Sequence, residues 1–272
     1  MDARLHRLVE LAGEHYPCSV RHLYYRAVVD KMPGITKDNR GYGKVQRAVL
    51  GLRREGRIPY AWITDNSRSG FIVDSHDGPE DFLTDVAGLY RRDLWRHTPF
   101  RVEVWCESDS IAGTLMDITS KWRVPLYPIK GQSSETFVYN GVQQWRHRPE
   151  ARPVVLYVGD HDPAGLEIEA TLQTKLTDFA AAAGLDAPDF HRIGVTWQQA
   201  VDQDLPGTTP KKAYGYPLAV EAEALQPRYL RQLLDDAIGL YVDPDQLQHL
   251  LTIEAEERDG LRRLAEAYGH TA

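Results

Sequence analysis

The sequence predicts an α/β protein in which a mostly helical N-terminal domain precedes a Rossmann-like parallel sheet with C-terminal helices. Two observations lead to this prediction. Apolar residues recur at helical spacing through residues 5–52, and from Arg101 onward short apolar segments alternate with helical ones. Because such alternation is typical of doubly wound α/β sheets, we predict two domains, residues 1–98 and residues 99–272.

Helical periodicity predicts three helices in the N-terminal domain. The first contains residues 5–12, the second begins after Ser19 as its N-cap, and the third has its apolar residues at 45, 49 and 52. Residues 58–63 and 70–73 are predicted to form two short strands around a polar turn. Three helices followed by a small hairpin is the order of a winged helix, whose third helix commonly enters the major groove of DNA.

The second domain is predicted to contain four strands that alternate with helices. The segment 154–158 is almost entirely apolar, as is typical of a central strand in a parallel sheet. The other predicted strands are residues 102–106, 124–129 and 191–195. The helices between them are predicted at 108–122, from 133, and at 164–183, and the chain closes with helices at 227–240 and 245–267.

The composition excludes several classes of protein. With 42% hydrophobic and 26% charged residues, the chain has the make-up of a soluble globular protein, and no apolar run is long enough to span a membrane. Cys18 and Cys106 are too few for a disulfide framework, and no Cys or His residues stand at zinc-binding spacing. We therefore expect a cytoplasmic protein without zinc.

Positive charge is concentrated near the N-terminus, although the chain as a whole carries −7. Residues 21–68 contain eleven Lys and Arg residues against four Asp and Glu residues, a local charge of +7. A local basic surface can bind nucleic-acid phosphates whatever the total charge is. The alternative is an ordinary solvated surface.

Two carboxylates stand directly after the most apolar predicted strand, in the segment Gly159-Asp160-His161-Asp162-Pro163-Ala164-Gly165. Open α/β sheets bind their ligands at the carboxyl ends of the strands. Mg²⁺ commonly takes one or two carboxylates together with water and phosphate oxygens, so Asp160 and Asp162 are candidate ligands. The alternative is a pair of loop acids or helix caps.

Glu107 follows the first predicted strand in the same way. If both strands belong to one parallel sheet, Glu107, Asp160 and Asp162 emerge at the same edge, where three acids repel one another unless a cation neutralises them. We therefore predict a Mg²⁺ site (Mn²⁺ is an alternative) on these three residues. The alternative for Glu107 is a solvated acid at a helix N-terminus.

A strand that ends in Glu, followed later by a strand that ends in Asp-x-Asp-x-x-Gly, resembles the Toprim pattern of topoisomerases, primases and related nucleases. The form Asp-x-Asp-Pro-x-Gly most resembles the topoisomerase VI A subunit and the related meiotic double-strand-break transesterase. Those proteins carry a winged helix before the Toprim domain, so the resemblance covers most of this chain. Because the chain is short, it looks like a compact stand-alone "mini-A" version.

In that family the winged helix carries a nucleophilic tyrosine in a motif of Arg followed by a paired aromatic-Tyr, which Arg21-His22-Leu23-Tyr24-Tyr25 resembles. Helical geometry places Tyr24 on the apolar stripe of the second helix. Tyr25 lies four residues after Arg21 on the adjacent polar face, where a phosphate could meet both side chains. We predict that Tyr25 is the nucleophile. The alternative is that both tyrosines only pack.

The resemblance implies Mg²⁺-dependent cleavage of double-stranded DNA by tyrosine transesterification, with Glu107 as a ligand or as a general acid/base. It also implies a homodimer in which each tyrosine meets the partner's metal site. A separate ATPase subunit is a further candidate partner. The candidate DNA-binding residues are Lys44, Arg47, Arg53, Arg54, Lys130, Lys211 and Lys212. Glu221 and Glu223 could approach the metal, but we favour the alternative that they are surface acids of a helix.

Two other functions remain open at this point. One is a Toprim endonuclease that hydrolyses DNA with metal-activated water, in which Tyr25 is only structural. The other is a non-catalytic winged-helix protein that binds DNA.

Overall fold

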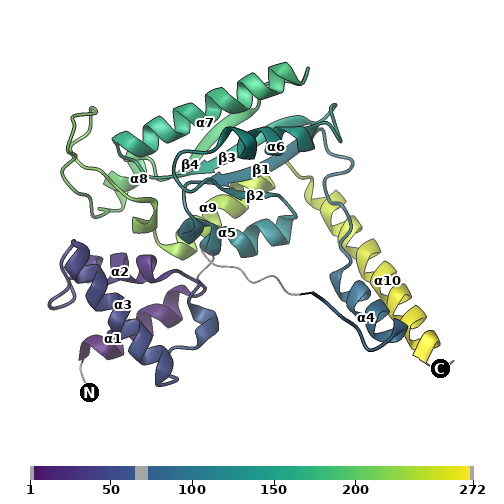
Figure 1. The fold of residues 1–272 in the computed structure, drawn as a ribbon, viewed down its shortest axis with the longest axis horizontal. Helices are drawn as coiled ribbons and strands as arrows, with labels where there is room; N and C mark the ends of the chain where they lie inside the picture. Colours follow the sequence, from purple (N-terminus) through teal and green to yellow (C-terminus); the bar gives the residue numbers. More distant parts are fainter. Residues whose placement is uncertain (1–2, 65–72, 270–272) are drawn as a thin grey trace. The chain divides into compact units, whose positions relative to one another are not determined.

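The computed structural model describes residues 3–64 and 73–269. It divides into two compact units, one holding residues 1–68 and 99–238 and the other holding residues 69–98 and 239–272 (Figure 1). The predicted α/β class is confirmed, and the N-terminal helices belong to the same unit as the sheet. The two predicted domains, residues 1–98 and 99–272, stay a prediction.

The predicted N-terminal helices are confirmed as α1 (Ala3–His15), α2 (Val20–Val29) and α3 (Asn39–Arg54), which pack on one another. The side chain of Ser19 caps α2 by accepting the N–H of His22, as predicted for this residue type before an apolar run. The apolar stripes of the helices are buried. For example, Leu8, Leu23 and Val49 are each at most 2% exposed.

The strand predicted at residues 58–63 is wrong. The segment instead contains the short 3₁₀ helix η1 (Tyr60–Trp62), which Pro59 precedes with φ −56°. Ile63 makes a single parallel bridge with Cys18, so this part of the chain pairs with the segment before α2 and not with a hairpin partner. Apart from Val73, the second strand of the predicted hairpin lies outside the described residues.

Among the described residues, four parallel strands form one sheet in the order β2-β1-β3-β4. These are β1 (Phe100–Cys106), β2 (Leu126–Pro128), β3 (Arg152–Val158) and β4 (Asp189–Gly194). The predicted strands are thus confirmed with small shifts of their ends. Cys106 of β1 lies opposite Val158 of β3, so the residues that follow both strands leave the sheet at the same edge.

Helices cover both faces of the sheet (Figure 1). Helices α6 (Glu135–Trp145) and α7 (Pro163–Ala182) lie on one face, and α5 (Asp109–Trp122) and α9 (Pro227–Gly239) lie on the other. Alternate residues of the central strands point to opposite faces. The face toward α6 and α7 therefore has a core containing Trp105, Val155 and Tyr157. Two short elements, α8 (Trp197–Asp202) and η2 (Ala222–Ala224), follow β4.

The second unit pairs α4 (Pro79–Leu89) with α10 (Pro244–Gly269). Its polar contacts tie the segment after α4 to α10. The hydroxyl of Tyr90 donates to Glu257 at 2.7 Å, and the backbone N–H of Arg92 donates to the buried Glu254 at 2.7 Å. Throughout the described residues, no helix combines the length and apolar character needed to cross a bilayer.

Glu103 is a buried carboxyl in the middle of β1. One of its oxygens accepts the indole N–H of Trp145 at 2.9 Å, and the other accepts the indole N–H of Trp105 at 3.3 Å. Burial raises the pKa of Glu103 to about 7, although both hydrogen bonds act in the opposite direction. The charged form of this side chain therefore costs stability.

We predict that the free energy of unfolding falls between about pH 4.5 and about pH 7 because of Glu103, since the folded state binds its proton more tightly than the unfolded chain. Below this window the cost is absent, and above it the cost is complete, at up to about 3 kcal/mol. Glu103→Gln removes this part of the pH dependence. Urea unfolding of both proteins at pH 5 and pH 8 measures it, and an equal pH dependence in the two would contradict the prediction.

Candidate functional site

A pocket of 340 Å³ lies at the carboxyl edge of the sheet. The ends of β1 and β3, the start of α5, and single residues of α2 and η2 contribute to it. Its lining residues are Arg21, Glu107, Ser108, Asp109, Ile111, Lys130, Gly131, Asp160 and Glu223. Two of the predicted acids, Glu107 and Asp160, therefore meet in one pocket together with Arg21.

Backbone hydrogen bonds hold Glu107 in place. Its own N–H donates to the carbonyl of Val158 at 3.0 Å, and its carbonyl accepts the N–H of Gly131 at 3.1 Å. The carboxylate accepts the N–H of Asp160 at 2.9 Å. The turn at Lys130 and Gly131 has φ of 55° and 85°, a left-handed conformation that suits glycine, and it brings Lys130 into the pocket.

Asp162 has a different position from the other two predicted ligands. Its carboxylate caps α7 by accepting the N–H of Gly165 at 2.7 Å, and it is not among the residues that line the pocket. It still lies near enough to Glu107 to raise the pKa of that carboxyl. In the structure the side chain of Asp162 is therefore a helix cap, which was the alternative interpretation of this residue.

Gly165 allows α7 to begin directly against the loop that carries Asp160. A Cβ atom at this position would lie 2.3 Å from the carbonyl oxygen of Asp160, far inside van der Waals contact. The glycine of the Asp-x-Asp-x-x-Gly segment is thus required by close approach. Its φ is not in the left-handed region, so conformational freedom is not the reason.

Glu223 joins the pocket through a pairing between distant parts of the chain. His161 and Val220 exchange two backbone hydrogen bonds of 2.8 and 3.0 Å, and the N–H of Ala222 then donates to the carboxylate of Asp160 at 2.8 Å. Glu223 is only 4% exposed and accepts the hydroxyl of Ser108 at 3.3 Å. The interpretation of this residue as a helix-surface acid was wrong.

The pKa values of three pocket carboxyls are raised. Burial is the largest cause in each case. Glu223 and Glu107 further raise the pKa of Asp160, while Asp162 and Glu223 raise that of Glu107. Burial and Glu221 raise the pKa of Glu223. The pocket is thus a place where negative charge is costly.

Two arginines oppose this accumulation of negative charge. Arg21 lowers the pKa of Glu223, and Arg192 lowers that of Glu107. Arg192 extends from β4, forms an ion pair with Glu169 at 2.7 Å, and donates to the carbonyl of Gly159 at 2.9 Å. No local sequence pattern predicts that Arg192 acts at this pocket, because its contact is with the loop after the neighbouring strand, β3.

Arg21 connects α2 to the acids that follow Val220. Its Nε donates to Glu221 at 2.9 Å, and the same atom lies 3.9 Å from Glu223. The hydroxyl of Tyr25, one turn later on α2, lies near enough to Glu221 for this carboxylate to raise its pKa. Burial, followed by the charge of Glu221, raises the pKa of Tyr25 well above its usual range.

The two adjacent tyrosines have different surroundings. Tyr24 is in the core, as predicted, and its hydroxyl donates to the backbone carbonyls of Thr36 and Asp38. Tyr25 was placed on a polar face, but it is only 2% exposed, because the segment around η2 packs against α2. Its polar neighbours are ionisable, and the ammonium of Lys37 lies 5.5 Å from its ring centroid.

The predicted DNA-binding residues of α3 lie on two of its sides. Lys44, Arg47 and Arg54 are exposed, on the side opposite the buried stripe. Arg53 stacks on the ring of Tyr60 at 4.2 Å and lines a second pocket of 380 Å³. Arg21 and Asp109 line both this pocket and the acidic one, so the two pockets adjoin.

The other predicted basic residues lie on loops. The side chain of Lys130 is 61% exposed, and its ammonium lies 3.0 Å from Asp109 at the acidic pocket. Lys211 and Lys212 are exposed on the loop between α8 and η2, and the structure places neither in the acidic pocket.

Within the described ranges, no three His, Cys, Asp or Glu side chains are grouped so that they could hold a metal ion as they stand. The chemistry of the pocket nevertheless fits a divalent cation. Its donors are carboxylate oxygens, which are ligands that Mg²⁺ prefers. The carboxyl groups are buried and lie near one another, and both factors raise their pKa values. A bound cation would relieve the repulsion that raises them. Glu107, Asp160 and Glu223 are the residues that would hold it.

Comparison with known proteins found no match for this chain among protein-family models, curated proteins or solved structures.

We predict that Gly165→Ala destabilises the protein by about 1–3 kcal/mol, because the added Cβ forces α7 and the carbonyl of Asp160 apart. Gly51→Ala is the matched control. Gly51 also lies in a helix, has no atom within 4 Å of an added Cβ, and should gain up to about 1 kcal/mol from helix propensity. Chemical denaturation measures both, and equal effects of the two substitutions would refute the packing argument.

We also predict that Asp160→Asn raises the melting temperature in buffer without divalent cations, since it removes one charge from the repelling set. The expected rise is about 2–4 °C for each kcal/mol of relieved repulsion. Asp162→Asn is the comparison, because asparagine is an equally good helix cap and Asp162 does not line the pocket. Since Asp162 also raises the pKa of Glu107, this variant should melt at a slightly higher temperature than the wild type, but the rise should be smaller than that of Asp160→Asn.

Differential scanning calorimetry with EDTA, and then with added Mg²⁺, makes this comparison. Mg²⁺ should stabilise the wild type more than Asp160→Asn. If Asp160→Asn melts at a lower temperature than the wild type in EDTA, repulsion among the pocket carboxylates is weaker than the stabilising contacts of Asp160, and the prediction is contradicted.

Proposed function

We propose that this chain is a divalent-metal-dependent enzyme that cleaves DNA phosphodiesters at the acidic pocket, and that it is a compact relative of Toprim proteins of the topoisomerase VI A type. The observation that supports this most is the meeting of Glu107, Asp160 and Glu223 with Arg21 at the carboxyl edge of a parallel sheet. Such an arrangement joins carboxylates suited to a cation with a guanidinium suited to a phosphate.

In this proposal Glu107, Asp160 and Glu223 hold a Mg²⁺ or Mn²⁺ ion, which when bound neutralises charge on the phosphate. Arg21 and Lys130 bind the phosphate from the two sides of the pocket. Each of them now contacts an acid, Glu221 and Asp109 respectively, so both contacts must be exchanged for the phosphate when DNA binds.

Tyr25 is the proposed nucleophile. Its proton passes to Glu221, the carboxylate whose charge acts on the hydroxyl, and the phenolic oxygen forms a bond to phosphorus as the bond to the 3′ oxygen breaks. Lys130, which lines the pocket, would give a proton to the departing 3′ oxygen. The strand is then held as a phosphotyrosine, and reversal of the same steps reseals it.

A second candidate function is hydrolysis of DNA by water at the same pocket, and one observation favours it. Tyr25 is 2% exposed and has a raised pKa, so transesterification requires the segment around η2 to move away from α2. A water molecule needs no such movement, because the pocket is open without Tyr25.

The DNA is proposed to approach over α3. Lys44, Arg47 and Arg54 would contact the backbone, and Arg53 would continue this contact along the adjoining pocket toward Arg21. The N-terminal helices act as a winged-helix-type module in this proposal. A homodimer would make two cuts, an ATPase subunit is a candidate further partner, and the nucleoid is the expected location.

The test is incubation with supercoiled plasmid and Mg²⁺, followed by gels with and without protease treatment. The wild type should cut the plasmid and leave protein covalently attached to DNA ends. Tyr25→Phe should lose the adduct, while Tyr24→Phe, the matched control, should keep it because the Tyr24 hydroxyl contacts only backbone carbonyls. Asp160→Ala should lower cutting by about a thousandfold, the worth of several kcal/mol.

The same gels separate the alternatives. Cutting that survives Tyr25→Phe but not Asp160→Ala assigns hydrolysis. Binding of the plasmid with no cutting in Mg²⁺ or Mn²⁺ means that the chain is a DNA-binding protein without this catalytic activity.

A further inference from the structure

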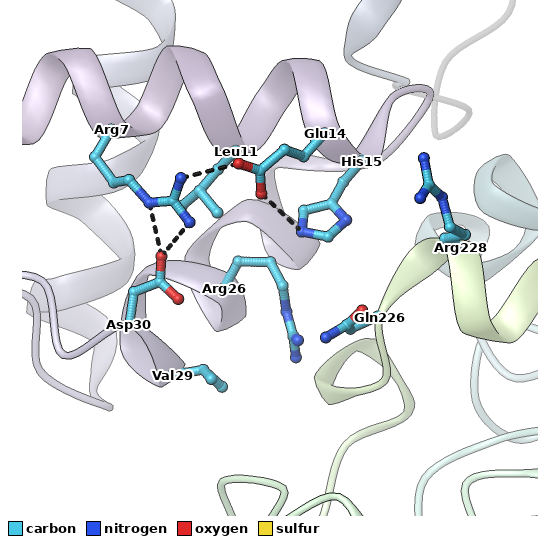
Figure 2. A pocket seen from close by; sticks show the side chains of 9 residues that line it. All are labelled: Arg7, Leu11, Glu14, His15, Arg26, Val29, Asp30, Gln226 and Arg228. Atoms are coloured by element: carbon cyan, nitrogen blue, oxygen red, sulfur yellow. Dashed lines mark hydrogen bonds and ion pairs between the residues drawn. The ribbon is translucent and has the colours of Figure 1, made fainter.

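A second polar pocket, of 430 Å³, lies between α1, α2 and the start of α9 (Figure 2). It shares no lining residue with the acidic pocket. Its lining residues are Arg7, Leu11, Glu14, His15, Arg26, Val29, Asp30, Gln226 and Arg228. The two acids of this pocket contact Arg7, whose Nε lies 2.9 Å from Asp30 and whose Nη1 lies 2.9 Å from Glu14.

Arg26 is the unusual residue of this pocket. It is only 4% exposed, its Nη2 donates to the carbonyl of Ala224, and its Nε has no hydrogen-bond partner. Among the described residues, no carboxylate lies within ion-pair distance of its guanidinium. In Figure 2 this guanidinium points toward Gln226 and away from Asp30. A buried guanidinium without a counterion is costly, so an anion at this place would be stabilised strongly.

The neighbourhood of Arg26 is electropositive. Burial is the largest cause that lowers the pKa values of His15 and His22, and the charges of Arg26 and Arg231 lower both further, while Glu14 acts in the opposite direction on His15. Arg228 further lowers the pKa of His15. The Nδ1 atom of His15 is buried without a hydrogen-bond partner, so a second polar atom of the lining lacks a contact. Arg231 itself donates to the carbonyl of Pro17.

The charges of the pocket leave room for an anion. Asp30 and Glu14 both pair with Arg7. Burial lowers the pKa of Arg26 and the charge of Asp30 raises it, but among the described lining residues neither Arg26 nor Arg228 forms an ion pair with a carboxylate. Arg228 is exposed at the first turn of α9, where the helix dipole also favours negative charge. Arg26 lies deep in the pocket and Arg228 at its surface, an arrangement that suits a ligand entering with its charged end first.

We propose that this pocket binds a phosphate monoester, with Arg26 and Arg228 as its recognition residues and Gln226 as a further hydrogen-bonding group. The phosphate comes either from a small molecule such as a mononucleotide or from the 5′ end of a DNA strand. This proposal does not depend on the cleavage activity, because it rests on a separate pocket and separate residues.

Isothermal titration calorimetry with inorganic phosphate and with AMP, on the full-length chain at low ionic strength, tests the proposal. Arg228→Gln should weaken binding by about tenfold or more, the worth of a charge-assisted hydrogen bond. Arg263→Gln is the matched control, since it also removes one exposed arginine charge from a helix but lies outside the pocket. Arg26→Met, which keeps the length of the buried stem, should abolish binding. If that variant fails to fold, Arg228→Gln decides alone.

A second arm identifies the source of the phosphate. Fluorescence anisotropy compares a DNA duplex that carries 5′ phosphates with the same duplex without them. If AMP does not bind but the phosphorylated duplex is preferred, and if Arg228→Gln removes this preference, the ligand is a DNA end. If neither inorganic phosphate, AMP nor the 5′ phosphate binds in an Arg228-dependent manner, the proposal is overturned.

Discussion

Burial of several carboxyl groups at one edge of a sheet costs free energy, and much of the first unit is organised around this cost. Burial raises the pKa values of three carboxyl groups there, those of Glu107, Asp160 and Glu223. Neighbouring carboxylates raise these pKa values further. Backbone N–H groups, Arg21 and Arg192 offset part of the repulsion. An acidic cluster retained at such a cost is typical of sites where stability is given up for function, because apolar residues could fill the same space without repulsion.

The segment that carries Glu223 also joins the N-terminal helices to the rest of the unit, through its neighbours Glu221 and Ala224. Arg21 and Tyr25 of α2 both reach Glu221, while Arg26 donates to the carbonyl of Ala224 at the end of η2. The resemblance to topoisomerase VI A implies a tyrosine that meets the metal site of a partner subunit. In this chain the tyrosine and the acidic pocket are linked through one loop of the same chain. Under the proposed mechanism, the loop around η2 is the element whose movement would decide whether Tyr25 meets the acidic pocket of its own chain or that of a partner.

The features of the fold and of the candidate site that could be predicted from the sequence are those that depend on residues close together in the chain. The ends of β1 and β3, Glu107, Asp160 and the cap before α2 follow from short runs of neighbouring residues, and the structure has them where they were expected. Arg192 could not be found in this way, and for Glu223 an approach to the site was only the less favoured of two interpretations. Glu223 reaches the pocket only because Val220 pairs with His161, and Arg192 acts across from β4 to the loop after β3. The predicted strand at 58–63 failed because Ile63 pairs with Cys18, which is also a contact between distant residues.

Tyr25 shows the limit of helical periodicity most clearly. A helical wheel divides α2 into an apolar stripe and a polar remainder, and it assigns Tyr25 to the remainder. The wheel treats that remainder as facing water, but a second element with matching charges can cover it. Here η2 brings Glu221 onto the polar side of α2, where Arg21 and the Tyr25 hydroxyl bind it, so that side is buried by polar contacts instead of apolar ones. A polar face of this kind separates more readily than an apolar core, because each of its groups can exchange its partner for a phosphate or for water.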